Sequence, residues 1–115
     1  MITKKNINIP IFRLKLKIVV VDAIKEALEI ESNIDPEADS CVIDHNNGTA
    51  TIVIASNDMS VIAHECLHVK NAVWLRIGYS PQALNDEVDA YLLDYIMTEV
   101  LKVVEKHTNK TLLKI

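Results

Sequence analysis

The sequence is poor in residues that break regular structure and in residues that crosslink it. Only two glycines, three prolines and two cysteines occur in 115 residues. So few breakers exclude a disordered or loop-dominated chain, and two cysteines without a CxxC pair exclude a disulfide framework. We expect Cys41 and Cys66 to be small buried apolar residues in a reducing compartment. Aromatic residues make up 4% of the chain and apolar residues 50%, so the expected core consists of Ile, Val, Leu and Ala.

Long apolar runs and an excess of positive charge are also lacking. The longest early apolar run, residues 18–21, is too short for a signal peptide or a membrane span. The net charge of -4 gives no general attraction to nucleic acid or to an anionic membrane. Arg13, Lys15 and Lys17 alternate with apolar residues, which favours a solvated strand face over a nucleic-acid patch. We therefore expect a cytoplasmic protein that binds neither nucleic acid nor membrane.

The first half of the chain predicts strands and one helix. Residues 11–19 (IFRLKLKIV) alternate strictly, which is typical of a half-buried strand. Residues 22–31 (DAIKEALEIE) carry an apolar stripe at helical spacing after a possible cap at Asp22. Residues 41–56 predict a β-hairpin whose turn contains Asn47-Gly48.

The second half predicts two long helices. One begins at Ser56, Asn57 or Asp58 and ends near Gly78; it is apolar around most of its circumference and is expected to be central. A connector with a possible helical turn at Pro81 leads to a last helix over residues 86–107. The order β-α-β-β-α-α predicts one α+β domain over residues 1–115, with a sheet of about three strands packed on helices.

The stretch VIAHECLHVK, residues 61–70, contains the strongest chemical signal. On a helix, His64 and His68 lie about 40° and 6 Å apart, so both imidazoles can meet one ion. Glu65 lies about 60° from His68 and can reach a water on that ion, whereas Cys66 lies about 160° away. Zinc would hold and acidify the water, and the glutamate would take its proton. The alternative is a buried helix whose polar residues are satisfied by neighbours.

A catalytic zinc usually has a third protein ligand. His45 in the hairpin turn and His107 at a helix end are candidates, but each is expected to be an ordinary solvated histidine. Glu87 is the stronger candidate, because it comes nineteen residues after His68 and opens a helix that can return antiparallel to the first. The alternative for Glu87 is a first-turn acid that the helix dipole favours.

The run HECLH followed by NDEVDAYLLDYI resembles the gluzincin pattern, and in particular the small phage-type HExxH zinc metallopeptidases. A more distant likeness is to the ImmA/IrrE type. The likeness covers about residues 41–100. It implies a minimal zincin-like fold and one Zn2+ ion on His64, His68 and Glu87, with Glu65 as the catalytic general base. No residue matches the Tyr or His that stabilises the oxyanion in larger gluzincins.

Two further contributions are predicted around this centre. Asp94 and Tyr91 follow Glu87 by two turns and one turn, and either could orient a ligating histidine or serve as an ordinary helix residue. The strand TATIVI, residues 49–54, takes the sequence position of the edge strand that pairs with substrate in gluzincins, so it could bind an extended peptide by strand addition. It could equally be an internal strand with no free edge.

These observations favour a zinc-dependent metallopeptidase-like protein that hydrolyses peptide bonds of a peptide or protein substrate. The first alternative is a non-catalytic, zinc-stabilised interaction protein, such as a phage accessory protein acting in the host cytoplasm. The second is a metal-free helical module in which the motif is accidental. The sequence carries no signal for an oligomeric state.

Overall fold

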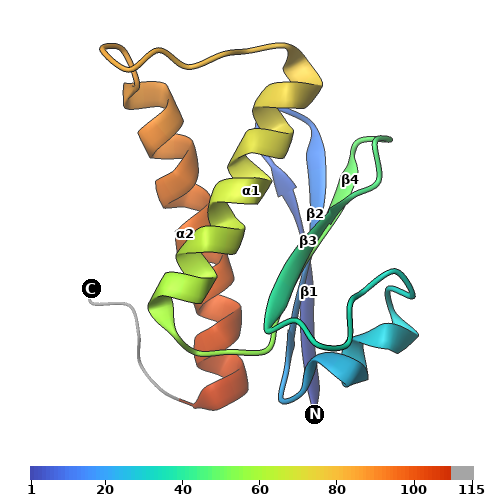
Figure 1. Cartoon of the computed structure of the whole chain (residues 1–115). Helices are drawn as coiled ribbons and strands as arrows, with labels where there is room; N and C mark the ends of the chain where they lie inside the picture. The colour runs from blue at the N-terminus through green and yellow to red at the C-terminus, as the bar shows by residue number, and fades with distance from the viewer. Residues whose placement is uncertain (110–115) are drawn as a thin grey trace.

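The computed structural model describes residues 1–109, which form a four-stranded mixed sheet with helices on one face (Figure 1). The strands are β1 (Ile2–Ile9), β2 (Leu14–Val21), β3 (Ser40–Asp44) and β4 (Thr49–Ile54), in the order β1-β2-β4-β3. β1 pairs with β2, and β3 with β4, as antiparallel neighbours. The two hairpins join through the parallel pair β2-β4. β3 is therefore an edge strand, and β4 is internal.

Two antiparallel helices, α1 (Met59–Ile77) and α2 (Glu87–Thr108), cover one face of the sheet. α1 begins at Asp58, whose side chain accepts a hydrogen bond from the Ser60 N–H, and ends at Gly78 in the left-handed conformation. Both caps satisfy backbone groups that a helix end leaves free. Within residues 1–109, neither helix is long and apolar enough to cross a membrane.

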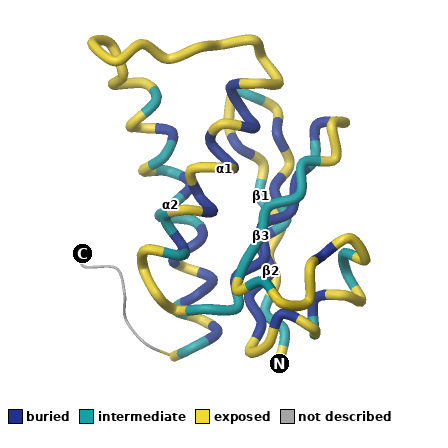
Figure 2. The backbone as a smooth tube through the Cα atoms, in the orientation of Figure 1, coloured by how far each residue is buried: buried dark blue, intermediate teal, exposed yellow. Residues whose placement is uncertain are grey.

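The alternation of the strands divides the buried residues into two clusters. Leu14, Leu16, Ile18 and Val20 of β2 point toward the helices and join the main core, together with Ile62, Cys66, Val69 and Val73 of α1 and the inner face of α2. Figure 2 shows buried segments on both helices and on the sheet between the two layers. Val19 and Val21 point to the opposite face of β2, where they pack under η1, a 3₁₀ helix over Ile24–Glu29. This second layer covers only one end of the outer sheet face.

Trp74 packs the C-terminal part of α1 against neighbouring segments. Its buried ring makes an edge contact with Phe12 of the β1–β2 turn at 5.1 Å and a tilted contact with Tyr79 at 4.6 Å. Its Nε1 donates to Asp89 Oδ1 at 2.5 Å, and Lys70 Nζ donates to the same oxygen at 2.6 Å. The first turn of α2 is thereby attached to the Lys70–Trp74 side of α1.

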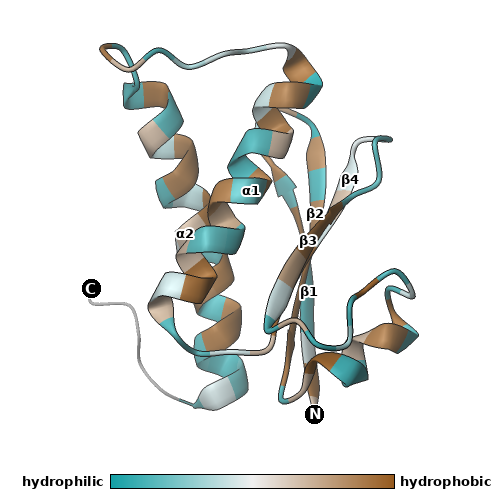
Figure 3. Ribbon diagram, viewed as in Figure 1, coloured by the Kyte–Doolittle hydropathy of each residue, from teal (hydrophilic) through white to brown (hydrophobic). Residues whose placement is uncertain are grey.

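The α+β class, the 41–56 hairpin and the two long helices are confirmed. The sheet, predicted to have about three strands, has four, because β1 adds a strand that was not predicted. The predicted helix over residues 22–31 is also wrong: only a 3₁₀ helix forms, over Ile24–Glu29, and it buries Ile24 and Ala27. No helical turn begins at Pro81, where a single bridge between Gln82 and Asn85 closes a turn instead. Figure 3 shows the polar connector that joins α1 to α2.

Candidate metal centre

His64, Glu65 and His68 form a compact group of possible metal ligands on α1. One ligand atom from each lies within 4.8 Å of the others. The Nε2 atoms of His64 and His68 are 3.2 Å apart, and their rings meet edge to face at 80°. Both imidazoles are exposed, whereas Glu65 is buried, with a relative exposure of 7%.

The amphipathic pattern of α1 explains this placement. Ile62, Cys66 and Val69 enter the core, so the histidines, which lie roughly on the opposite side of the helix, face solvent. Burial raises the pKa of the Cys66 thiol to about 12, with the nearby Glu65 charge adding to the effect. Cys66 is therefore a neutral core residue and not a ligand, as its position on the helix predicted.

Glu65 lies beneath the edge strand β3. Its Oε2 accepts a hydrogen bond from the Ser40 hydroxyl at 2.8 Å. Two hollows of about 530 and 420 Å³ meet at this pair, the larger also lined by His68 and the smaller by His64. The Glu65 carboxylate is thus fixed in the floor of an open groove, with one imidazole toward each end.

The spacing of the two nitrogens fits a shared metal ion. Two Zn–N bonds of about 2.0–2.1 Å that meet at a tetrahedral angle place their nitrogens about 3.3 Å apart, close to the 3.2 Å between these Nε2 atoms. Without an ion, the same distance corresponds to one imidazole donating a hydrogen bond to the other. Neutral imidazole nitrogen and carboxylate oxygen are ligand types that zinc accepts, so the donor chemistry also fits.

The structure does not bring Glu87 to this group. Glu87 is exposed at the first position of α2, and the ligand cluster found among residues 1–109 does not include it. The reason is the rotation of α1: Lys70 and Trp74, which contact α2 through Asp89, lie about 80° to 160° around the helix from the two histidines. The histidines instead turn toward β3.

The other predicted site residues lie elsewhere. His45 Nε2 is 3.0 Å from Glu31 on the outer sheet face. His107 is buried, not solvated as predicted, with its Nδ1 2.8 Å from the Thr3 hydroxyl and its Nε2 2.8 Å from Asp22. Tyr91 and Asp94 are exposed on α2, the helix from which the histidines turn away.

Ser40 contacts Glu65 although no sequence signal predicted it. Ser40 lies 25 residues before Glu65 and begins the edge strand, so no spacing rule connects the two. Only a correct docking of β3 on α1 could have identified it. Of the two expectations for TATIVI, the internal strand is confirmed and the free edge is wrong, because β4 is paired on both sides.

The comparisons with known proteins give no match for this chain, whether with family models, curated proteins or solved structures. The function must therefore be argued from the geometry of the chain itself.

Proposed function

We propose that this protein is a minimal zincin-like metallopeptidase that binds one Zn2+ ion through His64 and His68. The observation that carries the proposal is the 3.2 Å separation of the two Nε2 atoms beside a fixed carboxylate in an open groove. Both imidazoles are exposed, and their Nε2 atoms already lie at the distance that a shared ion requires, so little rearrangement is needed to bind one.

A zinc ion bound at such a site lowers the pKa of a coordinated water and polarises a carbonyl group. In the proposed reaction the residue that moves the proton is Glu65, which accepts it from the water and returns it to the leaving amine. The hydrogen bond from Ser40 aims the Glu65 carboxylate, so the base needs little reorganisation when substrate arrives. His64 and His68 hold their positions through the buried face of α1.

The groove suggests how a peptide would bind. Within residues 1–109, β3 has a strand neighbour on one side only, so its other edge could pair with an extended segment. That edge borders the groove that contains Ser40 and Glu65. A peptide added beside β3 would present its backbone carbonyls to the histidine pair.

One observation favours a second candidate, a non-catalytic zinc-stabilised interaction protein. Glu87 lies outside the ligand group, and the only carboxylate in that group is Glu65. If Glu65 itself ligates the ion, it cannot also act as the base, and the site becomes a structural one.

Glu65→Gln separates these two functions. In the enzyme, Glu65→Gln keeps stoichiometric zinc, measured by elemental analysis of untagged protein, and loses at least about 100-fold of its activity on a peptide library. Glu37→Gln, on the exposed loop before β3, is the control and should retain both. Loss of zinc from Glu65→Gln would assign Glu65 as a ligand and contradict the catalytic proposal.

We also propose that the protein works in a reducing compartment such as the cytoplasm. Both cysteines are free thiols. Thiols that are not joined in a disulfide are typical of proteins kept in such a compartment.

A further inference from the structure

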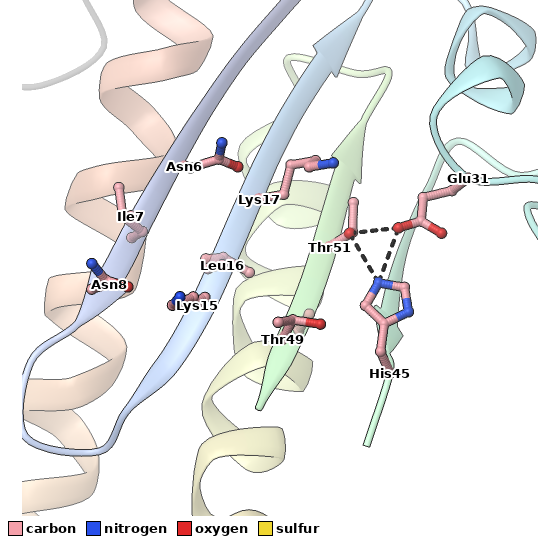
Figure 4. Close-up of a pocket in the computed structure, with 11 residues that line it drawn as sticks. Asn6, Ile7, Asn8, Lys15, Leu16, Lys17, Glu31, His45, Thr49 and Thr51 are labelled. Atoms are coloured by element: carbon pink, nitrogen blue, oxygen red, sulfur yellow. Dashed lines mark hydrogen bonds and ion pairs between the residues drawn. The ribbon is translucent and has the colours of Figure 1, made fainter. Parts of the chain in front are cut away.

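The outer face of the sheet carries a polar hollow that the metal centre does not use. It lies on the side away from α1 and α2, beside the part that η1 covers (Figure 4). Adjacent strands place the same three residue types side by side in two rows. The rows are Asn8-Lys15-Thr49 and Asn6-Lys17-Thr51.

The hollow has the dimensions of a small-molecule site. Its volume is about 490 Å³, within the usual range of ligand pockets. The two rows form its floor, and Glu31 and His45 form a wall beside Thr51. The sheet surface is hollowed here because two loops project from it beside Thr51. They are the segment after η1, which carries Glu31, and the β3–β4 turn, which carries His45.

Two lysines in this hollow are not engaged in ion pairs within the described part of the chain. Among residues 1–109, neither Lys15 nor Lys17 takes part in an ion pair. They are two residues apart on one face of β2, so their stems start about 7 Å apart, and both ammonium groups can reach one phosphate between them. Lysine is a common phosphate ligand in this point-charge role.

The wall next to Thr51 has a different chemistry. Glu31 Oε1 accepts from the Thr51 hydroxyl at 2.7 Å and lies 3.0 Å from His45 Nε2, which is 3.3 Å from Thr51 Oγ1. Because the carboxylate and the hydroxyl share one imidazole nitrogen, the three residues are not a nucleophile-base-acid triad. A carboxylate and an imidazole at a pocket wall are instead suited to bind ligand hydroxyl groups.

We propose that this hollow binds a small sugar monophosphate, with the phosphate between Lys15 and Lys17 and the sugar hydroxyls against Glu31 and His45. No Phe, Tyr or Trp side chain lines the hollow, so the large aromatic rings on which single-stranded nucleic acid stacks are missing from it. The Glu31 carboxylate also opposes a second phosphate along a chain. A sugar monophosphate has one anionic group for the two lysines and several neutral hydroxyl groups for the Glu31 and His45 wall.

The test is calorimetric titration of the full chain with ribose 5-phosphate, inorganic phosphate and ribose. Ribose 5-phosphate should bind most tightly, phosphate more weakly, and ribose without measurable heat. Lys15→Gln and Lys17→Gln should each weaken ribose 5-phosphate about tenfold or more. Lys25→Gln removes the same charge from the exposed side of η1 and should leave the affinity unchanged.

Glu31→Gln tests the sugar end independently. It should reduce the preference for ribose 5-phosphate over inorganic phosphate, while phosphate binds at least as well as before because a repulsive charge has gone. Because the hollow and the metal group lie on opposite faces of the sheet, Glu65→Gln should bind ribose 5-phosphate as the unaltered chain does. That result would hold even if no peptidase activity exists.

Three results would overturn the proposal. One is the absence of saturable binding of ribose 5-phosphate at about 10 mM, the weak end of specific binding. Another is equal weakening by Lys25→Gln and Lys17→Gln, which would show unspecific charge attraction. The third is tighter, Lys17-dependent binding of a ten-residue oligothymidine than of ribose 5-phosphate, which would assign the face to nucleic acid instead.

Discussion

The Glu65 side chain depends on one hydroxyl for its orientation. Its Oε2 accepts from Ser40 Oγ at 2.8 Å, and the residue is 7% exposed. A buried carboxylate that loses a hydrogen-bond partner must turn toward water or toward another donor. Ring nitrogens of His64 and His68 lie within 4.8 Å of the Glu65 carboxylate, so the hydrogen bond from Ser40 helps to keep Glu65 a base and not a third metal ligand.

Ser40→Ala should therefore lower peptide hydrolysis about tenfold without removing the metal, the size typical of outer-shell partners. The measurements are turnover on a cleaved library peptide and zinc content of the same sample. Ser80→Ala, in the exposed connector, is the control and should change neither. Unaltered turnover in Ser40→Ala would show that the hydroxyl does not position Glu65.

Ile11 occupies a backbone conformation that its side chain disfavours. It has a φ of 72° in the β1–β2 turn and is 88% exposed, so it contributes strain and little packing. A branched residue in the left-handed region costs about 1–2 kcal/mol, whereas asparagine adopts this region readily.

Ile11→Asn should stabilise the chain by about 1 kcal/mol and raise Tm by about 4 °C. Thermal unfolding followed by circular dichroism measures the change. Leu84→Asn removes another fully exposed apolar side chain at a position without positive φ and should leave Tm nearly unchanged. An equal gain in both variants would attribute the effect to surface polarity and not to backbone strain.

At the scale of elements, the contact between α1 and the first turn of α2 depends on a partly buried ion pair. Lys70 is 5% exposed and donates to Asp89, which also accepts from Trp74. Desolvation alone would raise the pKa of Asp89, but the hydrogen bonds from Lys70 and Trp74 outweigh it and hold that pKa below its ordinary value of 3.8. A carboxyl whose pKa is lowered by folding stabilises the folded state above its ordinary pKa and loses this contribution as the pH falls below it.

Asp89→Asn should lower the free energy of unfolding by about 2 kcal/mol at pH 7, less than for a fully buried pair because Asp89 keeps 20% of its side-chain exposure. The difference from the unaltered chain should shrink as the pH falls from about 5 through 3.8, because Asp89 is protonated first in the unfolded state and only at lower pH in the folded state. Urea unfolding across this range measures it. Asp86→Asn, one turn earlier and exposed, should show no such convergence, and a constant difference for Asp89→Asn would contradict the ion-pair explanation.

The elements differ in how far the sequence could predict them. α1 and the β3–β4 hairpin have strong local signals, since Asp58, Gly78 and Asn47-Gly48 mark their ends and turn. β1 was missed because lysine and asparagine, which are rare in strands, supply half of its residues. Its Ile7-Asn8-Ile9 alternation was the available signal, and its lysines protect an edge strand from further pairing. The stripe over residues 23–30 fits a 3₁₀ helix as well as an α-helix, so spacing alone could not decide between them.

The candidate site also has a part that the sequence could predict and a part that it could not. His64, Glu65 and His68 share one helical turn, so helix geometry alone brought them together. The place of Glu87 depends on how α2 rotates against α1, which the long-range contacts of Asp89 with Lys70 and Trp74 decide. No periodicity within one element contains that information.

At the scale of the whole molecule, the sheet separates two different surfaces. Its helix-covered face supports the histidine pair beside β3, and its outer face carries the hollow around Lys15 and Lys17. The inner rows of β2 and β4 are apolar and fully buried, so the two sites share a rigid wall but no side chain. A ligand bound at one site should therefore stabilise the fold whether or not a ligand occupies the other site.

Zinc binding should appear directly in the stability of the whole chain. At a free concentration 100-fold above Kd, an ion that binds only the folded state adds about 2.7 kcal/mol, or about 10 °C in Tm for a chain of this size. The double variant His64→Ala/His68→Ala should lose this shift, and His45→Ala should keep it, because His45 lies on the outer sheet face.

The same measurement on Glu87→Gln decides the third ligand. If Glu87 stays outside the group as placed here, the zinc-dependent rise in Tm should match that of the unaltered chain. A rise that is smaller by several degrees would mean that zinc binding rotates or shifts α2 so that Glu87 reaches the histidines, as the gluzincin resemblance implies. That shift would have to break the Asp89 contacts with Lys70 and Trp74, so Asp89→Asn would then increase zinc affinity, whereas it should leave the affinity unchanged if α2 stays where it is.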